Sequence, residues 1–145
     1  MPPAGDLAAF LGGFVAAEGC FGHSGNRFRF AIGLGSIDAS LCDVFAATLG
    51  VGRISRSFRR KSNYDDEVTF AVQSLRQLVE VVVPFMDAHL PASHKRAQYD
   101  AWREELLAYW KDRAKRRRPC TAPGCHRPRR ARGLCRSHYY DHHGR

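Results

Sequence analysis

Residues 11–19 read LGGFVAAEG, a segment that combines three glycines with a single carboxylate, that of Glu18. Glycine disfavours the interior of a helix, yet residues 7–18 otherwise suit a helix that Asp6 would cap. Small side chains spaced four residues apart form a stripe along which a second helix can approach closely. We expect this stripe to be a contact between two protein helices. It comprises Ala9, Gly12, Gly13, Ala16 and Ala17.

The net charge of +9 is concentrated at one end of the chain. Residues 1–110 hold 11 basic and 12 acidic side chains, whereas residues 111–145 hold 12 basic and 2 acidic ones. Such a basic block favours binding to a polyanion, and nucleic acid is the leading candidate. No apolar run approaches the roughly 20 residues that span a bilayer, and the N-terminus lacks the pattern of a secretory signal. We therefore expect an intracellular protein, cytoplasmic or associated with the nucleoid, with no membrane partner.

The periodicity of apolar residues predicts an alternation of helices and hairpins. The predicted order is a helix over residues 7–18, a hairpin over 20–34, a helix over 38–49, a hairpin over 51–73, a helix over 74–83 and a last helix over 92–113. Gly50 should end the second helix, and Pro84 should break the third. This order indicates an α+β domain with an antiparallel four-stranded sheet.

Five segments of this domain resemble LAGLIDADG homing endonucleases. Residues 11–21, LGGFVAAEGCF, are similar to the signature of that family. The similarity continues through FRFAIGLGSID (28–38), LGVGRI (49–54), VTFAVQ (68–73) and VVPFMDAHLPASHKRAQYDAW (82–102). The resemblance covers roughly residues 7–110. It implies the αββαββα fold of the family, whose four-stranded sheet forms a saddle against the DNA major groove.

The resemblance also implies cleavage of both strands of DNA at a specific site. In the family the acid at the end of the signature helix binds a divalent metal, and the match places this role on Glu18. Mg²⁺ suits a site made of carboxylate, phosphate oxygens and water. Because the chain has one signature, the resemblance implies a homodimer in which two copies of Glu18 lie beside the two scissile phosphates. Lys95 corresponds to a basic residue near the active site, although His94 and Arg96 adjoin it in the sequence.

Two positions depart from the family pattern. The sixth signature position, commonly Asp, is Ala16, and no Gln follows the second strand, where Leu34 or Ser36 takes its place. The basic side chains of the predicted hairpins suit the DNA-facing surface of the saddle, where Arg can bind guanine or phosphate. The candidate DNA contacts of the sheet are Arg27, Arg29, Arg53, Arg56, Arg59, Arg60 and Gln73.

The last 26 residues, CTAPGCHRPRRARGLCRSHYYDHHGR, predict a second, metal-binding module. The pattern C-x4-C-x9-C-x2-H, which can close a tetrahedral zinc site, is formed by Cys120, Cys125, Cys135 and His138. The alternative fourth ligands are His126, His142 and His143. The segment also resembles small zinc-finger modules that read G-C…A-R-G-L-C-x-x-H-Y. Four protein ligands leave no open position, so the Zn²⁺ would be structural and would supply much of the folding energy.

The remaining cysteines and arginines have simpler interpretations. Cys20 and Cys42 lie apart from the metal pattern, and we expect both to be buried apolar residues. The arginines around the zinc pattern are expected to meet DNA phosphates and so to extend the footprint of the main domain. They are Arg127, Arg129, Arg130, Arg132 and Arg136.

The sequence thus predicts an endonuclease domain over residues 1–112, a basic linker over 113–119 and a zinc-finger module over 120–145. The leading hypothesis is a metal-dependent, homodimeric DNA endonuclease of the homing type, which cleaves an allele that lacks the mobile element, such as an intron, encoding it. Two alternatives keep the same fold. One is a DNA-binding regulator that does not cut, and the other is an RNA-splicing cofactor, or maturase.

Overall fold

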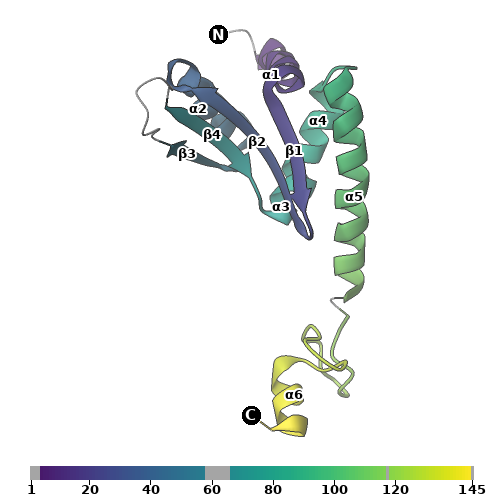
Figure 1. The fold of residues 1–145 in the computed structure, drawn as a ribbon. Coiled ribbons are helices and arrows are strands. Elements are labelled where there is room, and N and C mark those ends of the chain that lie inside the picture. Colours follow the sequence, from purple (N-terminus) through teal and green to yellow (C-terminus); the bar gives the residue numbers. More distant parts are fainter. Residues whose placement is uncertain (1–3, 58–65, 117, 145) are drawn as a thin grey trace. The chain divides into compact units, whose positions relative to one another are not determined.

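The computed structural model describes residues 4–57, 66–116 and 118–144, which fall into two compact units, residues 1–107 and 108–145. In chain order the elements are α1 (Ala4–Glu18), β1 (Gly19–Ser24), β2 (Arg27–Gly35), η1 (Ser36–Asp38), α2 (Ala39–Leu49), β3 (Arg53–Ser57), β4 (Glu67–Val72), α3 (Leu75–Gln77), the π-helical segment η2 (Leu78–Val82), α4 (Val83–His89), α5 (His94–Arg116) and α6 (Arg136–His143) (Figure 1). The predicted α+β class is confirmed. None of the described helices is long and apolar enough to cross a membrane.

The four strands form one antiparallel sheet in the order β1-β2-β4-β3. β1 and β2 are joined by the two-residue turn Gly25–Asn26, in which Gly25 has a φ of +57° that a glycine adopts without strain. Gly50 ends α2 with a φ of +68°, as predicted. In β2 exposed and buried side chains alternate except at Ala31, which is buried, so one face of the sheet packs on the core and the other faces outward.

Aromatic side chains on the inner face of the sheet join it to α5. The ring of Phe21 lies 5.1 Å from the ring centroids of both Tyr99 and Trp102. The indole nitrogen of Trp102 also donates a hydrogen bond to the carbonyl oxygen of Gly22 at 3.0 Å. α5 is therefore held to the hairpin both by packing and by a directional bond to its backbone.

The chain continues through Pro84 without a break, so the prediction that this proline ends the helix is wrong. Ser74 caps α3 by accepting a hydrogen bond from the Gln77 amide, as its position in the sequence suggested. The π-helical turn of η2 then shifts the hydrogen-bonding register immediately before Pro84, which lies in the first turn of α4. The change of register in η2 accommodates Pro84, which has no amide hydrogen to donate to the preceding helical turn.

α1 packs very closely on the end of α4. A methyl group built on Gly12 would lie 2.0 Å from the carbonyl oxygen of His89, so only glycine fits this position. Gly12 is buried inside its own subunit and takes no part in the exposed stripe to which it was assigned from the sequence. The opposite side of α1 is exposed at Ala9, Gly13 and Ala17.

Candidate nucleic-acid interface and metal cluster

The outward face of the sheet is a grid of side chains whose rows are set by the strand register. One row holds Cys20, Ala31, Ala71 and Arg53, and the neighbouring row holds Gly33, Thr69 and Ser55. These side chains are small except at the ends of the grid. They therefore project little from the sheet and leave this face accessible to a partner with a wide surface. Successive rows are roughly 6.8 Å apart along the strands, because residues on one face are two positions apart.

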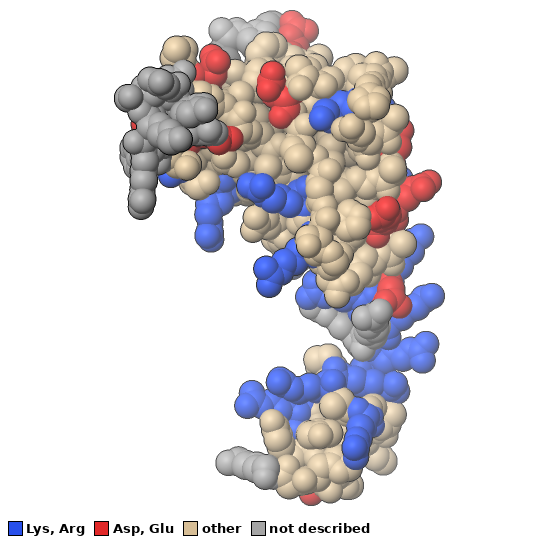
Figure 2. Space-filling view, in the orientation of Figure 1, with Lys and Arg blue, Asp and Glu red and all other residues tan. Residues whose placement is uncertain are grey.

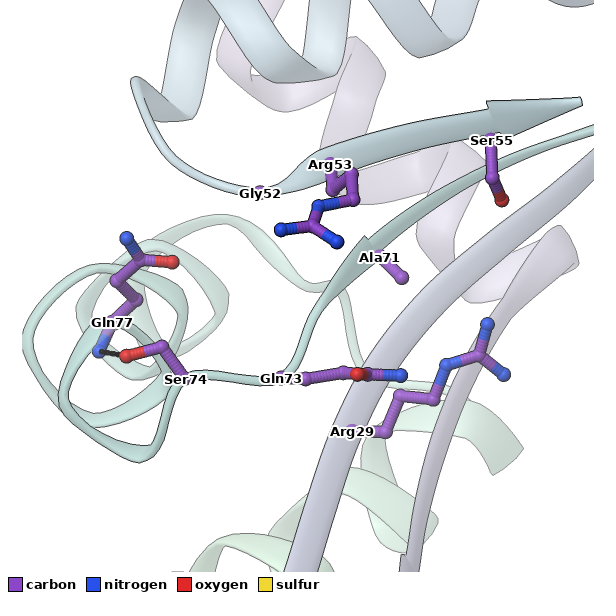
Figure 3. Close-up of a pocket in the computed structure, with 8 residues that line it drawn as sticks. All are labelled: Arg29, Gly52, Arg53, Ser55, Ala71, Gln73, Ser74 and Gln77. Carbon is purple, nitrogen blue, oxygen red and sulfur yellow. Dashed lines mark hydrogen bonds between the residues drawn. The ribbon is translucent and has the colours of Figure 1, made fainter.

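Long polar side chains surround a hollow at one end of this face. The hollow has a volume of about 450 Å³, and its lining includes Arg29, Arg53, Ser55, Gln73 and Gln77. Figure 3 shows Arg29 on β2, Arg53 on β3 and Gln73 just after β4 arranged around it. Arg presents only hydrogen-bond donors and Gln presents both donors and acceptors, which is the combination that reads purine edges.

The structure distributes the predicted DNA contacts of the sheet unequally. Arg27, Arg29 and Arg53 are exposed on the outward face, and the exposed Gln73 follows β4. Arg56 pairs with the buried Val68 and therefore lies on the opposite face, the one covered by helices, so its assignment to the same surface is wrong. Two further candidates lie outside the described residues, namely Arg59 and Arg60.

Glu18 lies at the junction between α1 and the sheet. It is the last residue of α1, it is exposed, and the next residue, Gly19, pairs with Ile32 of β2. Glu18 therefore lies one position before β1, where the register of β1 and β2 would continue to Gly33. Glu18 also lies at the C-terminal end of a helix, where the helix dipole disfavours a negative charge unless a cation is present.

Lys95 lies half-buried in the first turn of α5. Its neighbour Arg96 is engaged elsewhere, because its Nη1 donates to the carbonyl oxygen of Leu90 at 2.6 Å and its Nε donates to Asp100 at 3.2 Å. Among the described residues, no hydrogen bond or ion pair joins Lys95 to Glu18.

The sequence did not identify Glu67 as a member of this surface. Glu67 is the first residue of β4, and its side chain folds over Gly33, where an added methyl group would lie 2.4 Å from the Glu67 Oε1. A second carboxylate therefore lies over the row of the grid that adjoins Glu18. The signal available in the sequence was weak, because it consists of a glycine and an acid on strands that are far apart along the chain.

The four residues of the predicted zinc pattern come together in the C-terminal unit. The ligand atoms of Cys120, Cys125, Cys135 and His138 all lie within 4.8 Å of one another. The Nδ1 of His138 lies 3.4 Å from the sulfurs of Cys120 and Cys135, and the sulfurs of Cys125 and Cys135 are 3.9 Å apart. Bonds of about 2.3 Å to sulfur and 2.0 Å to nitrogen would place the ligands of a tetrahedral zinc ion roughly 3.5–3.8 Å apart, so the donor set fits zinc.

Backbone amides favour thiolates at this cluster. Although burial acts in the opposite direction, hydrogen bonds from the backbone of Cys135 and Ala122 lower the pKa of Cys120 to about 6. A hydrogen bond from the backbone of His138 likewise lowers the pKa of Cys135. Although a hydrogen bond from the Arg127 backbone acts in the opposite direction, burial and hydrogen bonds with the other two cysteines raise the pKa of Cys125. Thiolates are the form that binds metal, so two of the three cysteines favour a bound cation. The three alternative histidines are not part of the cluster, namely His126, His142 and His143.

The C-terminal unit is rich in exposed arginine. Figure 2 shows basic side chains gathered on it, whereas most acidic side chains lie on the 1–107 unit. Two of the arginines make hydrogen bonds within the unit. Arg127 donates to the Ser137 hydroxyl at 2.7 Å, and Arg129 donates to the carbonyl oxygen of Pro119 at 2.9 Å.

The two other cysteines have different environments. Cys42 is fully buried, as expected, and burial raises the pKa of its thiol. Cys20 is exposed on the outward face beside Ala31, so the expectation that it is buried is wrong. Its position follows from the alternation of β1, in which Phe21 points into the core.

The helices behind one face of an antiparallel four-stranded saddle, together with the open outward face, define the fold of LAGLIDADG homing endonucleases. This chain is similar to the meganuclease I-SmaMI bound to uncleavable DNA, with a TM-score of 0.62 and 20% identity over 73% of this chain and 38% of that one. It is also similar to the LAGLIDADG meganuclease I-CpaMI bound to uncleaved DNA, with a TM-score of 0.60 and 24% identity over 73% of this chain and 39% of that one. A third similar structure is the homing endonuclease I-TnaI, with a TM-score of 0.59 and 20% identity over 72% of this chain and 74% of that one.

The chain therefore spans less than two fifths of the length of I-SmaMI and I-CpaMI but about three quarters of I-TnaI. No protein-family model matches the sequence, and a comparison with curated proteins finds no match. At these identities the similarity shows the fold. The activity has to be argued from the site.

Proposed function

We propose that this protein is a metal-dependent DNA endonuclease that cleaves both strands at a specific site. The observation that carries the proposal is the position of Glu18, an exposed carboxylate at the end of α1 and at the edge of the outward face of the sheet. The solved structures with the same fold include I-SmaMI and I-CpaMI bound to DNA, which supports DNA as the partner.

Glu18 would hold the catalytic Mg²⁺ together with phosphate oxygens and water. One exposed carboxylate suits this ion, which binds proteins through few carboxylates and keeps several waters. When bound, the ion activates water and neutralises charge on the attacked phosphate. Glu18 would keep the ion at the edge of the DNA-facing surface, and Lys95 would supply a positive charge near the same reaction. The carboxylate of Glu67, which lies over the adjoining Gly33, would add to the negative potential that attracts a cation.

The active form would be a homodimer in which two copies of α1 meet. The exposed side of α1 carries Ala9, Gly13 and Ala17, with Ala16 half-buried beside them. Phe10 is 48% exposed on the same helix, and a partner subunit would cover it. Two-fold pairing through this side would bring one Glu18 to each DNA strand.

The outward face would read the major groove, and the C-terminal module would bind phosphate. Arg27, Arg29, Arg53 and Gln73 would provide the contacts on the sheet. Zn²⁺ would hold the module together through its three cysteines and His138, over the proposed residues 120–145 that follow a basic linker at 113–119. Its arginines would add affinity that depends strongly on salt.

Glu18→Gln is the test of catalysis. Purified protein is incubated with Mg²⁺ and DNA that spans the genomic locus without the inserted element, and double-strand cuts are scored. The wild type should cut, whereas the variant should bind the same DNA with unchanged affinity and lose cleavage by about a thousandfold or more, because a metal ligand is removed. Glu104→Gln changes an exposed carboxylate of α5 and is the matched control.

The same assay separates the enzyme from its alternatives. If wild type and Glu18→Gln bind DNA equally and neither cuts with any divalent metal, the protein is a regulator. If it binds structured RNA of the host element and ignores the duplex, it is a splicing cofactor. Deletion of residues 118–145 should weaken binding to DNA and flatten its salt dependence, and unchanged affinity would reject the role of the module.

A further inference from the structure

A tight hairpin in the C-terminal unit holds an arginine in an unfavourable backbone conformation. Residues 131–134 form a two-residue turn, in which Leu134 donates to the carbonyl oxygen of Ala131 at 2.9 Å and Ala131 donates back to Leu134 at 3.2 Å. The two central residues are Arg132, with a φ of +49°, and Gly133, with a φ of +77°. This turn type favours Asn, Asp or Gly at both central positions. Among the described residues, Arg132 alone has a positive φ without being glycine.

The fold of the unit gives no reason for an arginine at this position. The side chain of Arg132 is exposed, and it makes no hydrogen bond or ion pair with any described residue. The neighbouring Arg130 is exposed in the same way, although its amide donates to Leu134. Arg127 and Arg129, in contrast, use their guanidinium groups for hydrogen bonds inside the unit. A strained residue without a structural role points to a function outside the fold.

The position of Arg132 at the tip of a hairpin suits binding in a narrow groove of DNA better than binding to phosphates on the DNA surface. A phosphate on the surface of DNA could be reached from any of the exposed arginines, so it would not require one at a strained turn. A two-residue hairpin is the narrowest tip that a protein backbone offers, and the minor groove of B-DNA is only about 6 Å wide. That groove presents acceptors at A·T pairs, and its narrow form in A-tracts attracts arginine.

We propose that the hairpin at residues 131–134 inserts Arg132 into the minor groove of A·T-rich DNA, with Arg130 on the adjoining phosphates. The inference rests on the proposed function only in requiring that the protein binds duplex DNA, and it does not require cleavage. Under this proposal the C-terminal unit recognises the narrow minor groove of A·T-rich DNA, in addition to attracting DNA phosphates through its positive charge. The proposal also assigns different roles to four of the five arginines that the sequence grouped together, namely Arg127, Arg129, Arg130 and Arg132.

The test measures two properties of Arg132→Asn in the full chain loaded with zinc. The first is binding, without Mg²⁺, to two short duplexes of identical base composition, one with A-tracts and one whose A·T pairs are broken into flexible TA steps. The wild type should prefer the A-tract duplex about tenfold, and the variant should lose that preference. The second property is the temperature at which the C-terminal unit unfolds, which should rise in the variant because Asn suits the left-handed turn.

Arg136→Gln is the matched control, because it removes an equal charge from exposed α6 and leaves the turn unchanged. It should weaken binding to both duplexes alike and keep their ratio. Arg132→Lys should keep the charge but reduce the preference, because an ammonium group is more strongly hydrated. A preference that survives in Arg132→Asn overturns the insertion, and a lower unfolding temperature in that variant overturns the argument from strain. If the wild type binds the two duplexes equally, only this inference fails. If it binds neither, the proposed function fails as well.

Discussion

The two units of the chain differ in the interactions that stabilise their folds. The 1–107 unit has a core of fully buried aromatic and aliphatic side chains, among them Phe30, Phe45 and Phe70. In the described part of the 108–145 unit, the buried residues are Cys120 and Cys135, both in the metal cluster. The first unit gains stability from apolar area removed from water, whereas the second would gain it from metal–ligand bonds.

This difference also determines what each unit can present to a partner. A unit with an apolar core can leave a whole sheet face open, and here that face carries small side chains with a few long polar ones at its end. A unit that one ion would hold together needs few apolar residues, so most of its surface is available for arginine. We therefore expect that a change which destabilises one unit leaves the stability of the other unit unaffected.

Removal of the metal should have the largest effect, and it should be confined to the second unit. Chelation or Cys135→Ser should unfold residues 118–144, because metal binding supplies on the order of 10 kcal/mol in small zinc modules. An NMR spectrum should lose the dispersed signals of this unit and keep those of residues 4–107. Cys20→Ser, which changes a cysteine outside the cluster, should retain the metal and the full spectrum. Dispersed signals from residues 118–144 without metal would contradict the proposed role of zinc.

The next effect should appear in the first unit, at the contact between α1 and α4. Gly12→Ala should lower the free energy of unfolding by about 3 kcal/mol or more, because the added methyl group meets the carbonyl oxygen of His89. Gly5→Ala, also in α1 but outside the proposed dimer contact, places a methyl group where nothing lies within 4 Å, and it should leave that free energy unchanged or raise it by up to about 1 kcal/mol. Urea unfolding followed by tryptophan fluorescence measures both variants. Equal stability of the two would show that the helices are not in close contact.

The fold could be predicted from the sequence because most local signals agreed with the family resemblance. The turn at Gly25 and the end of α2 at Gly50 are positions where glycine adopts a positive φ. The Cys/His pattern was equally informative, because its four potential ligand atoms do come together within 4.8 Å of one another. In both cases the constraint lies within a short stretch of chain.

The wrong predictions concern features that depend on contacts between distant segments, or on which face of a strand a residue occupies. Arg53 and Arg56 are three residues apart, and a strand with a period of two cannot place both on one face. That correction was available from the sequence and was missed. The passage of the helix through Pro84 depends on a local π-helical turn, for which the apolar pattern gives no signal. The position of Glu67 over Gly33 is known only when the register of β2 and β4 is known.

A smaller effect, specific to the first unit, should appear in alkaline solution. Burial raises the pKa of Tyr99 well above its usual value of 10.0, and the hydrogen bond of its hydroxyl to Asp87 acts in the same direction. Because the folded state retains this proton more tightly, the stabilisation is complete below pH 10 and is lost as the pH rises through and beyond that value. The unfolding midpoint of the 1–107 unit should therefore fall above pH 10. Tyr99→Phe should lose about 1–2 kcal/mol at neutral pH and show a weaker alkaline decline, and an unchanged decline would contradict the assignment.

The smallest change to the molecule is the labelling of one thiol. The rate of labelling should distinguish a cysteine on the outward face of the sheet from those in the core and in the metal cluster. In the zinc-loaded chain a thiol reagent should modify Cys20 first, because Cys42 is buried with a raised pKa and the other cysteines belong to the cluster. Cys20→Ser should abolish the rapid phase. Because Cys20 shares a row of the sheet with Ala31, Ala71 and Arg53, DNA bound to the outward face should protect it. Labelling of Cys20 at the same rate with and without bound DNA would place the DNA elsewhere, even if the C-terminal unit still accounts for the salt dependence of binding.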